Sequence, residues 1–134
     1  MIVVDTSVVV AGFASWHQQH ELADDALGAG AQLLAHCAIE AFSVLTRLPP
    51  PHRAPADVVR DFLGARFPGP YVALDASGHR ALIPRLVELG ISGGAVYDAL
   101  IAATASAAGA TLISCDRRAV QIYERLGVDH RLLV

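Results

Sequence analysis

Ile2-Val3-Val4-Asp5-Thr6-Ser7, at the start of the chain, is an apolar run that ends at a carboxylate and two hydroxyls. Three β-branched residues in succession predict a short strand that is buried on both faces. Such strands lie at the centre of parallel sheets, whose two faces are both covered. Because open α/β sheets bind their ligands at the carboxyl ends of the strands, we expect Asp5 to lie where chemistry takes place.

The bulk composition indicates one globular domain that spans residues 1–134. Hydrophobic residues make up 54% of the chain, which is too many for a disordered segment. The formal net charge is only −3, and all ten basic residues are arginine. If four of the thirteen acidic residues are pooled in one site, ten basic residues face nine acidic ones over the remaining surface. An acidic pocket in a nearly neutral, arginine-rich surface suits a metal site that handles phosphates.

Cysteine usage and hydropathy predict a cytoplasmic protein without a membrane segment. Cys37 and Cys115 are too few for a disulfide framework. No basic segment followed by an apolar one marks a signal peptide. Residues 99–115 carry no charge, but they are only weakly apolar and Gly109 interrupts them. A buried helix followed by a buried strand explains this stretch better than a membrane span does.

Apolar periodicity and the positions of glycine and proline predict strands that alternate with helices. After the first strand, helices are predicted over residues 8–13, 20–28, 38–48, 55–65, 77–89, 95–108 and 118–126, and strands over residues 32–35, 71–74, 111–114 and 131–134. This alternation is typical of a three-layer α/β/α sandwich on a parallel β-sheet.

Side-chain chemistry and spacing also predict the caps and the inner faces of these helices. Thr6 or Ser7 is expected to cap the first helix. The inner faces are predicted from apolar residues at helical spacing: Leu22, Ala23, Ala26 and Leu27 in the second helix, Ile39, Phe42, Leu45 and Leu48 in the third, and Val58, Val59 and Phe62 in the fourth.

Two further aspartates stand in positions that favour a shared site with Asp5. Asp116 follows the apolar strand 111–114 and precedes a helix, as Asp5 does, although either residue could simply cap its helix. Asp98 is the only charge in the helix 95–108, which is apolar or small almost all round and is therefore expected to be buried. An ionised carboxylate there needs a partner, a metal ion or water. Its position in the first turn also suits the helix dipole, which is the simpler explanation.

Glu40 completes a set of four carboxylates. We expect it in the first turn of the helix that follows the second strand, where a lone glutamate is more often just solvated. The carboxyl ends of parallel strands and the starts of the following helices share one edge of the sheet, so the topology brings Asp5, Glu40, Asp98 and Asp116 to that edge. Four converging carboxylates repel one another unless a divalent cation lies among them. Oxygen-only ligands favour Mg²⁺ or Mn²⁺ over zinc.

These residues together resemble a known family. Ile2-Val-Val-Asp5-Thr6-Ser7, Glu40 in its helix, Tyr97-Asp98-Ala-Leu-Ile-Ala-Ala-Thr-Ala105 and Thr111-Leu-Ile-Ser-Cys-Asp116 look like the motifs of a PIN-domain ribonuclease. The chain length and the lack of an appended domain resemble the VapC toxins of bacterial toxin–antitoxin pairs. Each motif is weak alone, whereas four in this order and spacing are fairly specific, and they span most of the chain.

The resemblance implies a function and a set of site residues. It implies an endoribonuclease that depends on Mg²⁺ or Mn²⁺ and is inhibited by a cognate VapB-type antitoxin. Asp5, Glu40, Asp98 and Asp116 fall on the acidic positions of the family, as catalytic residues and metal ligands. Thr6, Ser7 and Ser114 fall near positions where the family often has a supporting hydroxyl. Arg117 follows the last acid and is either a phosphate ligand or an ordinary solvated arginine.

The expected partners are RNA, the antitoxin and a second copy of the chain. A homodimer is expected because the chain is small and its helices have many apolar faces. Phe13 and Trp16 are either core residues or an exposed patch that an antitoxin covers. His17 and His20 could share a helix face as metal ligands but lack a third ligand nearby. His36 and Cys37 follow the second strand and are more simply explained by packing.

The sequence opposes three other functions. A haloacid-dehalogenase-like phosphatase needs a second aspartate at the position of Ser7, and a response-regulator receiver needs a lysine, which this chain lacks. The alternative from another class is a catalytically silent PIN-like module that binds RNA or protein. Four intact carboxylates oppose it, because a pure binder of polyanions would gain affinity by losing them.

Overall fold

The computed structural model describes residues 1–134 and contains four strands and seven helices. The strands are β1 (Ile2–Val4), β2 (Gln32–Leu33), β3 (Thr111–Ser114) and β4 (His130–Leu132). The helices are α1 (Thr6–Phe13), α2 (His20–Gly28), α3 (Ala35–Thr46), α4 (Ala56–Arg66), α5 (Ala76–Leu89), α6 (Ala95–Ala107) and α7 (Arg117–Leu126). Strands and helices therefore follow the predicted order, apart from one strand.

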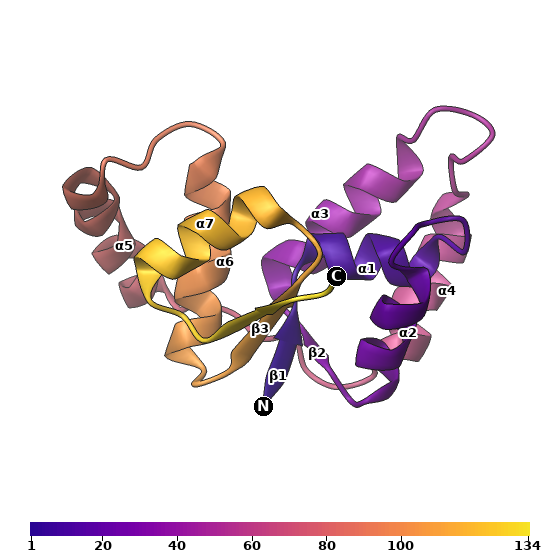
Figure 1. The fold of residues 1–134 in the computed structure, drawn as a ribbon, viewed down its shortest axis with the longest axis horizontal. Helices are drawn as coiled ribbons and strands as arrows, with labels where there is room; N and C mark the ends of the chain where they lie inside the picture. The colour runs from indigo at the N-terminus through magenta and orange to yellow at the C-terminus, as the bar shows by residue number, and fades with distance from the viewer.

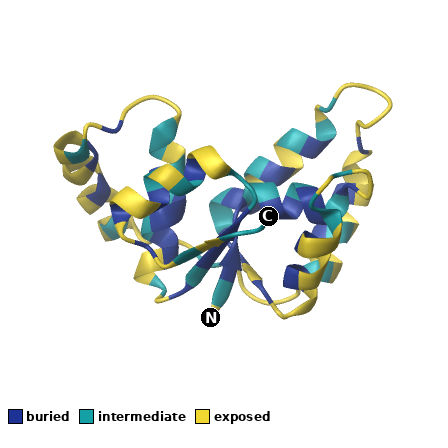
Figure 2. Cartoon of the chain, viewed as in Figure 1, coloured by how far each residue is buried: buried dark blue, intermediate teal, exposed yellow.

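The four strands form a single parallel sheet in the order β2-β1-β3-β4. The two central strands are the most apolar, and Val3, Val4, Leu112 and Ile113 are completely buried. Helices α1, α6 and α7 pack against these strands. Helices α2 and α3 pack on α1, α4 packs on α3, and α5 packs on α6. The helices thus form two groups, α1–α4 and α5–α7, which diverge from the sheet (Figure 1). Figure 2 shows the buried residues along the strands and the inward sides of the helices. The predicted three-layer α/β/α sandwich is confirmed.

The predicted strand 71–74 does not form. Only Val72 pairs with the sheet, in an isolated parallel bridge to Leu34. Strand β2 ends at Leu33 and α3 begins at Ala35, so no extended backbone is left for the residues after Val72 to pair with. The same early start of α3 shortens the predicted strand 32–35.

The first helix is capped by Asp5. The expectation of Thr6 or Ser7 was therefore wrong, and the alternative that Asp5 caps its helix is confirmed. The Asp5 carboxylate accepts from the backbone amides of Ser7 and Val8, at 3.0 and 3.4 Å. Its side chain therefore satisfies amides that the first helical turn leaves free. The helix in consequence starts at Thr6, and Asp5 is fixed in orientation where the chain turns from strand to helix.

The predicted inner faces of three helices were partly wrong. In α3 the small residues Cys37, Ala38 and Ala41 face inward with Leu45, while Ile39 is 75% exposed and Phe42 is 38% exposed. Leu22 in α2 and Val58 in α4 are also exposed. Small side chains let α3 lie close to α1, with which it packs, and the larger apolar side chains are left on the outside. None of the helices is long and apolar enough to cross a bilayer.

Candidate active site

Asp5 is the buried centre of the carboxyl edge of the sheet. It follows β1, is 3% exposed and holds onto the neighbouring strand through its backbone amide, which donates to Ile113 O at 3.1 Å. Burial raises the pKa of the Asp5 carboxyl, and hydroxyl donors around it partly offset that rise. An acid in such an environment gains stability from a nearby cation.

Two serines link Asp5 to the end of β3. Ser7 Oγ donates to Asp5 Oδ1 and accepts from the backbone amide of Cys115 at 2.8 Å. Ser114 Oγ lies 3.4 Å from Ser7 Oγ and accepts from the amide of Asp116 at 3.0 Å. Ser7 and Ser114, both named from the sequence, therefore connect the first and last acids of the candidate site through hydrogen bonds. Thr6 Oγ1 is instead buried without a hydrogen-bond partner.

Asp116 caps α7 and faces an open hollow. Its carboxylate accepts from the amides of Arg118 and Ala119, at 2.9 and 3.3 Å. The hollow has a volume of about 650 Å³, and its wall also includes Glu40, Arg117 and Arg118. Capping and a place in the site are thus compatible, because one cap oxygen leaves the other free to face the hollow.

Glu40 lies in the second turn of α3, so the expectation of the first turn was wrong; α3 begins at Ala35, three residues before the predicted start. Its carboxylate is 3.3 Å from His36 Nε2, one turn earlier on the same helix. The His36 ring in turn stacks on the ring of Tyr97 at the start of α6, with 5.6 Å between the ring centroids. Glu40 is therefore positioned through His36 beside the helix that carries Asp98.

Asp98 is the acid whose pKa responds to the charges of the other three. It lies in the first turn of α6, as expected, and is only partly buried. Burial and then the negative charges of Asp116, Asp5 and Glu40 raise its pKa to about 6, while the positive charge of Arg118 lowers it. The charges of three carboxylates from three other segments therefore act on Asp98.

The donor set fits a hard divalent cation in its chemistry. All four candidate ligands are carboxylates, which Mg²⁺ and Mn²⁺ prefer. The pKa of Asp98 is raised first by burial and then by like charges that a cation would neutralise. In their present positions no three His, Cys, Asp or Glu side chains converge on one point closely enough to hold an ion. Asp5 and Asp116 are engaged as helix caps, and Glu40 is engaged with His36.

The weaker sequence candidates have other partners. His17 Nδ1 accepts from the amide of Gln19, and His20 Nδ1 lies 2.8 Å from Ala11 O, so the two rings serve separate turns. Both cysteines are free, and burial raises the pKa of the Cys37 thiol and raises that of Cys115 to about 11.

The two aromatic candidates differ from each other. Phe13 packs edge-on against Phe62, with 5.2 Å between centroids, and belongs to the margin of the core. Trp16 is 53% exposed and lies on the ring of His52 at 4.3 Å. Only Trp16 therefore belongs to an exposed patch.

Sequence reasoning missed Tyr123, which is completely buried in α7. Its hydroxyl donates to Asp5 Oδ2 at 2.7 Å. Burial and then the charge of Asp5 raise the pKa of Tyr123, so the phenol keeps its proton and acts as the donor. The only sequence signal was a tyrosine on the inward face of α7, together with Ala119 and Leu126, and nothing in that pattern identifies a partner 118 positions away.

Comparison with known proteins agrees with this architecture. The model of the family described as PIN domain matches residues 2–125. The chain is 53% identical over 133 residues to Ribonuclease VapC40 of Mycobacterium tuberculosis, and the match covers 99% of both chains. It is 40% identical over 131 residues to Ribonuclease VapC27 of the same species, over 95% of this chain and 93% of the relative.

Proposed function

The chain belongs to the PIN-domain family and, within it, to the VapC-type ribonucleases, and from this premise we propose that it is an endoribonuclease dependent on Mg²⁺ or Mn²⁺. We propose further that it is the toxin of a type II toxin–antitoxin pair and acts on RNA in the cytoplasm. The observation that carries the proposal is the position of four acids near one edge of the sheet, where burial and then the charges of Asp116, Asp5 and Glu40 raise the pKa of Asp98 to about 6.

The four carboxylates are the proposed ligands of the cation. When bound, the cation supplies an activated water for attack on a phosphodiester and stabilises the leaving oxygen. Asp5 and Asp116 are fixed by their cap bonds. Oδ1 of Asp5 already accepts three hydrogen bonds, so its Oδ2 is the oxygen left to contact an ion, as is Oδ2 of Asp116. Asp98 is partly buried, and the exposed oxygens of Glu40 are held only by His36. Small rotations of Glu40 and Asp98 toward the two fixed acids are therefore the rearrangement that we expect on metal binding.

Arg117 and Arg118 are the proposed contacts for the RNA backbone. Both side chains are exposed, line the same hollow as Glu40 and Asp116, and take part in none of the ion pairs of the protein. A guanidinium presents a planar fork that matches two phosphate oxygens. RNA bound in this way would bring a phosphodiester next to the carboxylates.

A cleavage assay over a Mg²⁺ series tests the proposal. The full chain should cut a labelled single-stranded RNA at a rate that rises with Mg²⁺, and Asp116→Asn should be inactive. Asparagine is as good an N-cap as aspartate, so this variant keeps the start of α7 and removes only a ligand charge. A silent binding module would instead retain RNA without cutting it, and would bind RNA more tightly after this loss of negative charge.

We propose that the antitoxin covers an apolar hollow between α3 and α4. Ile39, Phe42, Leu63 and Tyr71 line it together with Arg60, and its volume is about 370 Å³. Ile39 directly precedes Glu40, so a chain seated here continues toward the acidic hollow and could extend a basic side chain into it. A site that concentrates negative charge favours such an inhibitor.

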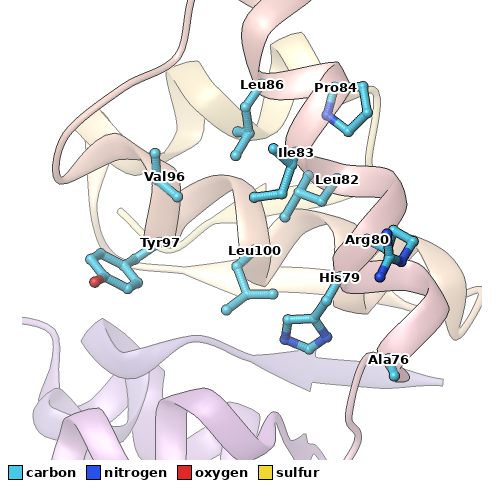
Figure 3. Close-up of a pocket in the computed structure, with 10 residues that line it drawn as sticks. All are labelled: Ala76, His79, Arg80, Leu82, Ile83, Pro84, Leu86, Val96, Tyr97 and Leu100. Carbon is cyan, nitrogen blue, oxygen red and sulfur yellow. The ribbon is translucent and has the colours of Figure 1, made fainter.

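We propose that a second copy of the chain covers the groove between α5 and α6. This groove has a volume of about 730 Å³, and Figure 3 shows Leu82, Leu86, Val96 and Leu100 along it. Ile83, which also lines the groove, and Val87, one turn further along α5, are 61% and 77% exposed. An apolar ridge next to an apolar groove is self-complementary, as the two-fold interface of a homodimer requires.

A further inference from the structure

Tyr123 joins the last helix to the most buried acid of the site. It is 0% exposed, and its hydroxyl donates to Asp5 Oδ2 at 2.7 Å. The other oxygen, Oδ1, accepts from the Ser7 amide, from Ser7 Oγ and from the Val8 amide. Tyr123 thus donates to Oδ2, and together with Ser7 it holds both oxygens of the carboxylate in place.

The helix that carries Tyr123 also carries Asp116 at its start. Asp116 is the N-cap of α7, and Tyr123 lies seven positions later, which is two helical turns on the same side of the helix. The Tyr123 hydroxyl therefore ties α7 to Asp5 on the side of the helix that Asp116 also occupies. This hydrogen bond therefore contributes, with those of Ser7 and Val8, to the orientation of Asp5, and it links Asp5 through α7 to Asp116.

Packing alone does not require the hydroxyl at this position. A buried phenylalanine would fill nearly the same volume without a polar atom that needs a partner. The partner here is not a backbone carbonyl, as it commonly is for buried side chains, but an acid of the candidate site. A hydrogen-bond donor behind a metal-ligating carboxylate sets the direction in which that ligand points.

We propose that Tyr123 is a positioning residue, whose hydroxyl orients Asp5 Oδ2 and holds Asp5 in register with Asp116 for binding of the divalent cation. The inference rests on the proposed function, because it assumes that Asp5 is a metal ligand. Loss of a donor of this kind weakens metal binding by about 10- to 100-fold in comparable sites. Tyr123→Phe is expected to show a loss in this range.

Calorimetric titration of the full-length chain with MnCl₂, in the absence of RNA, tests the inference. The wild type should bind Mn²⁺, and Tyr123→Phe should bind it at least tenfold more weakly. Tyr71→Phe is the matched control, because it removes a hydroxyl from a tyrosine that is 46% exposed, and it should bind as the wild type does. Leu126→Ala is the second control, because it loosens the packing of the buried face of α7 without changing a contact of Asp5. This variant should be less stable than the wild type, but its Mn²⁺ affinity should fall less than threefold.

The outcomes separate this inference from the proposed function. Equal Mn²⁺ affinity in the wild type and Tyr123→Phe, or an equal loss in Leu126→Ala, would overturn the positioning role and leave the metal site standing. A wild type that takes up no Mn²⁺ would overturn the metal site and the inference together.

A second measurement applies if Tyr123→Phe does not fold. In wild-type protein labelled at the tyrosine ring carbon that bears the hydroxyl, Mg²⁺ should shift the NMR signal of Tyr123. The chain has three tyrosines, so Tyr71→Phe and Tyr97→Phe identify the Tyr123 signal by elimination. A Tyr123 signal that stays in place while Mg²⁺ binds would contradict the inference.

Discussion

Asp98 carries its charge against three other carboxylates. Its pKa of about 6 lies above the ordinary value of 3.8, first because of burial and then because of Asp116, Asp5 and Glu40. An acid whose pKa is higher in the folded protein than in the unfolded chain favours folding when it is protonated. Its ionisation therefore costs stability as the pH rises from about 4 through 6, in the absence of a cation.

Asp98→Asn should be more stable than the wild type in EDTA near pH 7.5. The shift corresponds to roughly 3 kcal/mol, which solvent screening of this partly exposed group and the lost helix-dipole interaction reduce to ~1 kcal/mol. The gain should disappear below about pH 4, where Asp98 of the wild type is protonated. Thermal melts of both proteins from pH 4 to pH 8 measure it.

Mg²⁺ should reverse the order of the two proteins. Ligand binding stabilises the folded state in proportion to affinity, and the variant has lost a ligand charge. The wild type should therefore gain more from Mg²⁺ than Asp98→Asn does. If Asp98 only satisfies the start of α6, the variant will melt lower in EDTA, and both proteins will respond to Mg²⁺ alike.

The placement of Asp5 and Asp116 at one edge of the sheet could be predicted from the sequence, because topology alone decides it. Asp5 and Asp116 each follow an apolar strand, and parallel strands end at one edge of the sheet. The hydrogen bond from Tyr123 to Asp5 could not be predicted, since it depends on how α7 packs on the sheet and not on any local pattern. The sequence left the cap of the first helix open between Thr6 or Ser7 and Asp5. The spacing of a strand end and a helix start does not tell which of these three polar residues turns toward the free amides.

At the scale of elements, α3 shows where periodicity misleads. Ile39, Phe42, Leu45 and Leu48 have helical spacing, yet the inward side is built mainly from Cys37, Ala38 and Ala41. Hydrophobic spacing finds a helix and its apolar stripe, but small residues and a surface reserved for a partner can rotate the buried face away from the bulkiest side chains. The strand predicted over 71–74 failed for a related reason, since pairing depends on how far β2 extends.

Ile39→Asn should leave stability nearly unchanged, whereas Ala41→Asn should lower it. Ile39 is 75% exposed, so its substitution should change the free energy of unfolding by no more than about 0.5 kcal/mol. Ala41 is completely buried, so asparagine there adds volume and an unpartnered amide and should cost about 2 kcal/mol or more. Urea unfolding of the two variants measures both values.

The same Ile39 variant tests the antitoxin surface. If the hollow between α3 and α4 receives the antitoxin, Ile39→Asn should lose affinity for the product of the neighbouring short reading frame on co-expression and co-purification. Val87→Asn, on α5 in the other helix group, should keep its affinity for that product. Undiminished capture by Ile39→Asn would exclude this hollow as the antitoxin surface.

At the scale of the whole molecule, the sheet carries two diverging helix groups and one shared acidic edge (Figure 1). Each group has its own apolar hollow, between α3 and α4 in one and between α5 and α6 in the other. The acidic edge lies where the two groups meet, because Asp5 and Glu40 come from one and Asp98 and Asp116 from the other. The proposed antitoxin surface and the proposed dimer surface therefore do not overlap.

Ile83→Glu should convert a homodimer into monomers. Because a two-fold interface contains the same residue from both copies, the substitution buries two charges, and the desolvation free energy of each opposes association. Val58→Glu on α4 is the matched control, since Val58 is also exposed and lies on the other helix group. Light scattering after size-exclusion chromatography should give a dimer for the wild type and Val58→Glu and a monomer for Ile83→Glu. A dimer in all three proteins would exclude the groove between α5 and α6.

We propose that Asp5, Glu40, Asp98 and Asp116 together form a divalent-cation site that hydrolyses RNA. The end groups of the cleavage products test it most directly, because attack by activated water does not use the 2′-hydroxyl of RNA as the nucleophile. With Mg²⁺ the products should carry 5′-phosphate and 3′-hydroxyl ends, and EDTA should stop the reaction. Products that end in a 2′,3′-cyclic phosphate, or full activity in EDTA, would contradict the account.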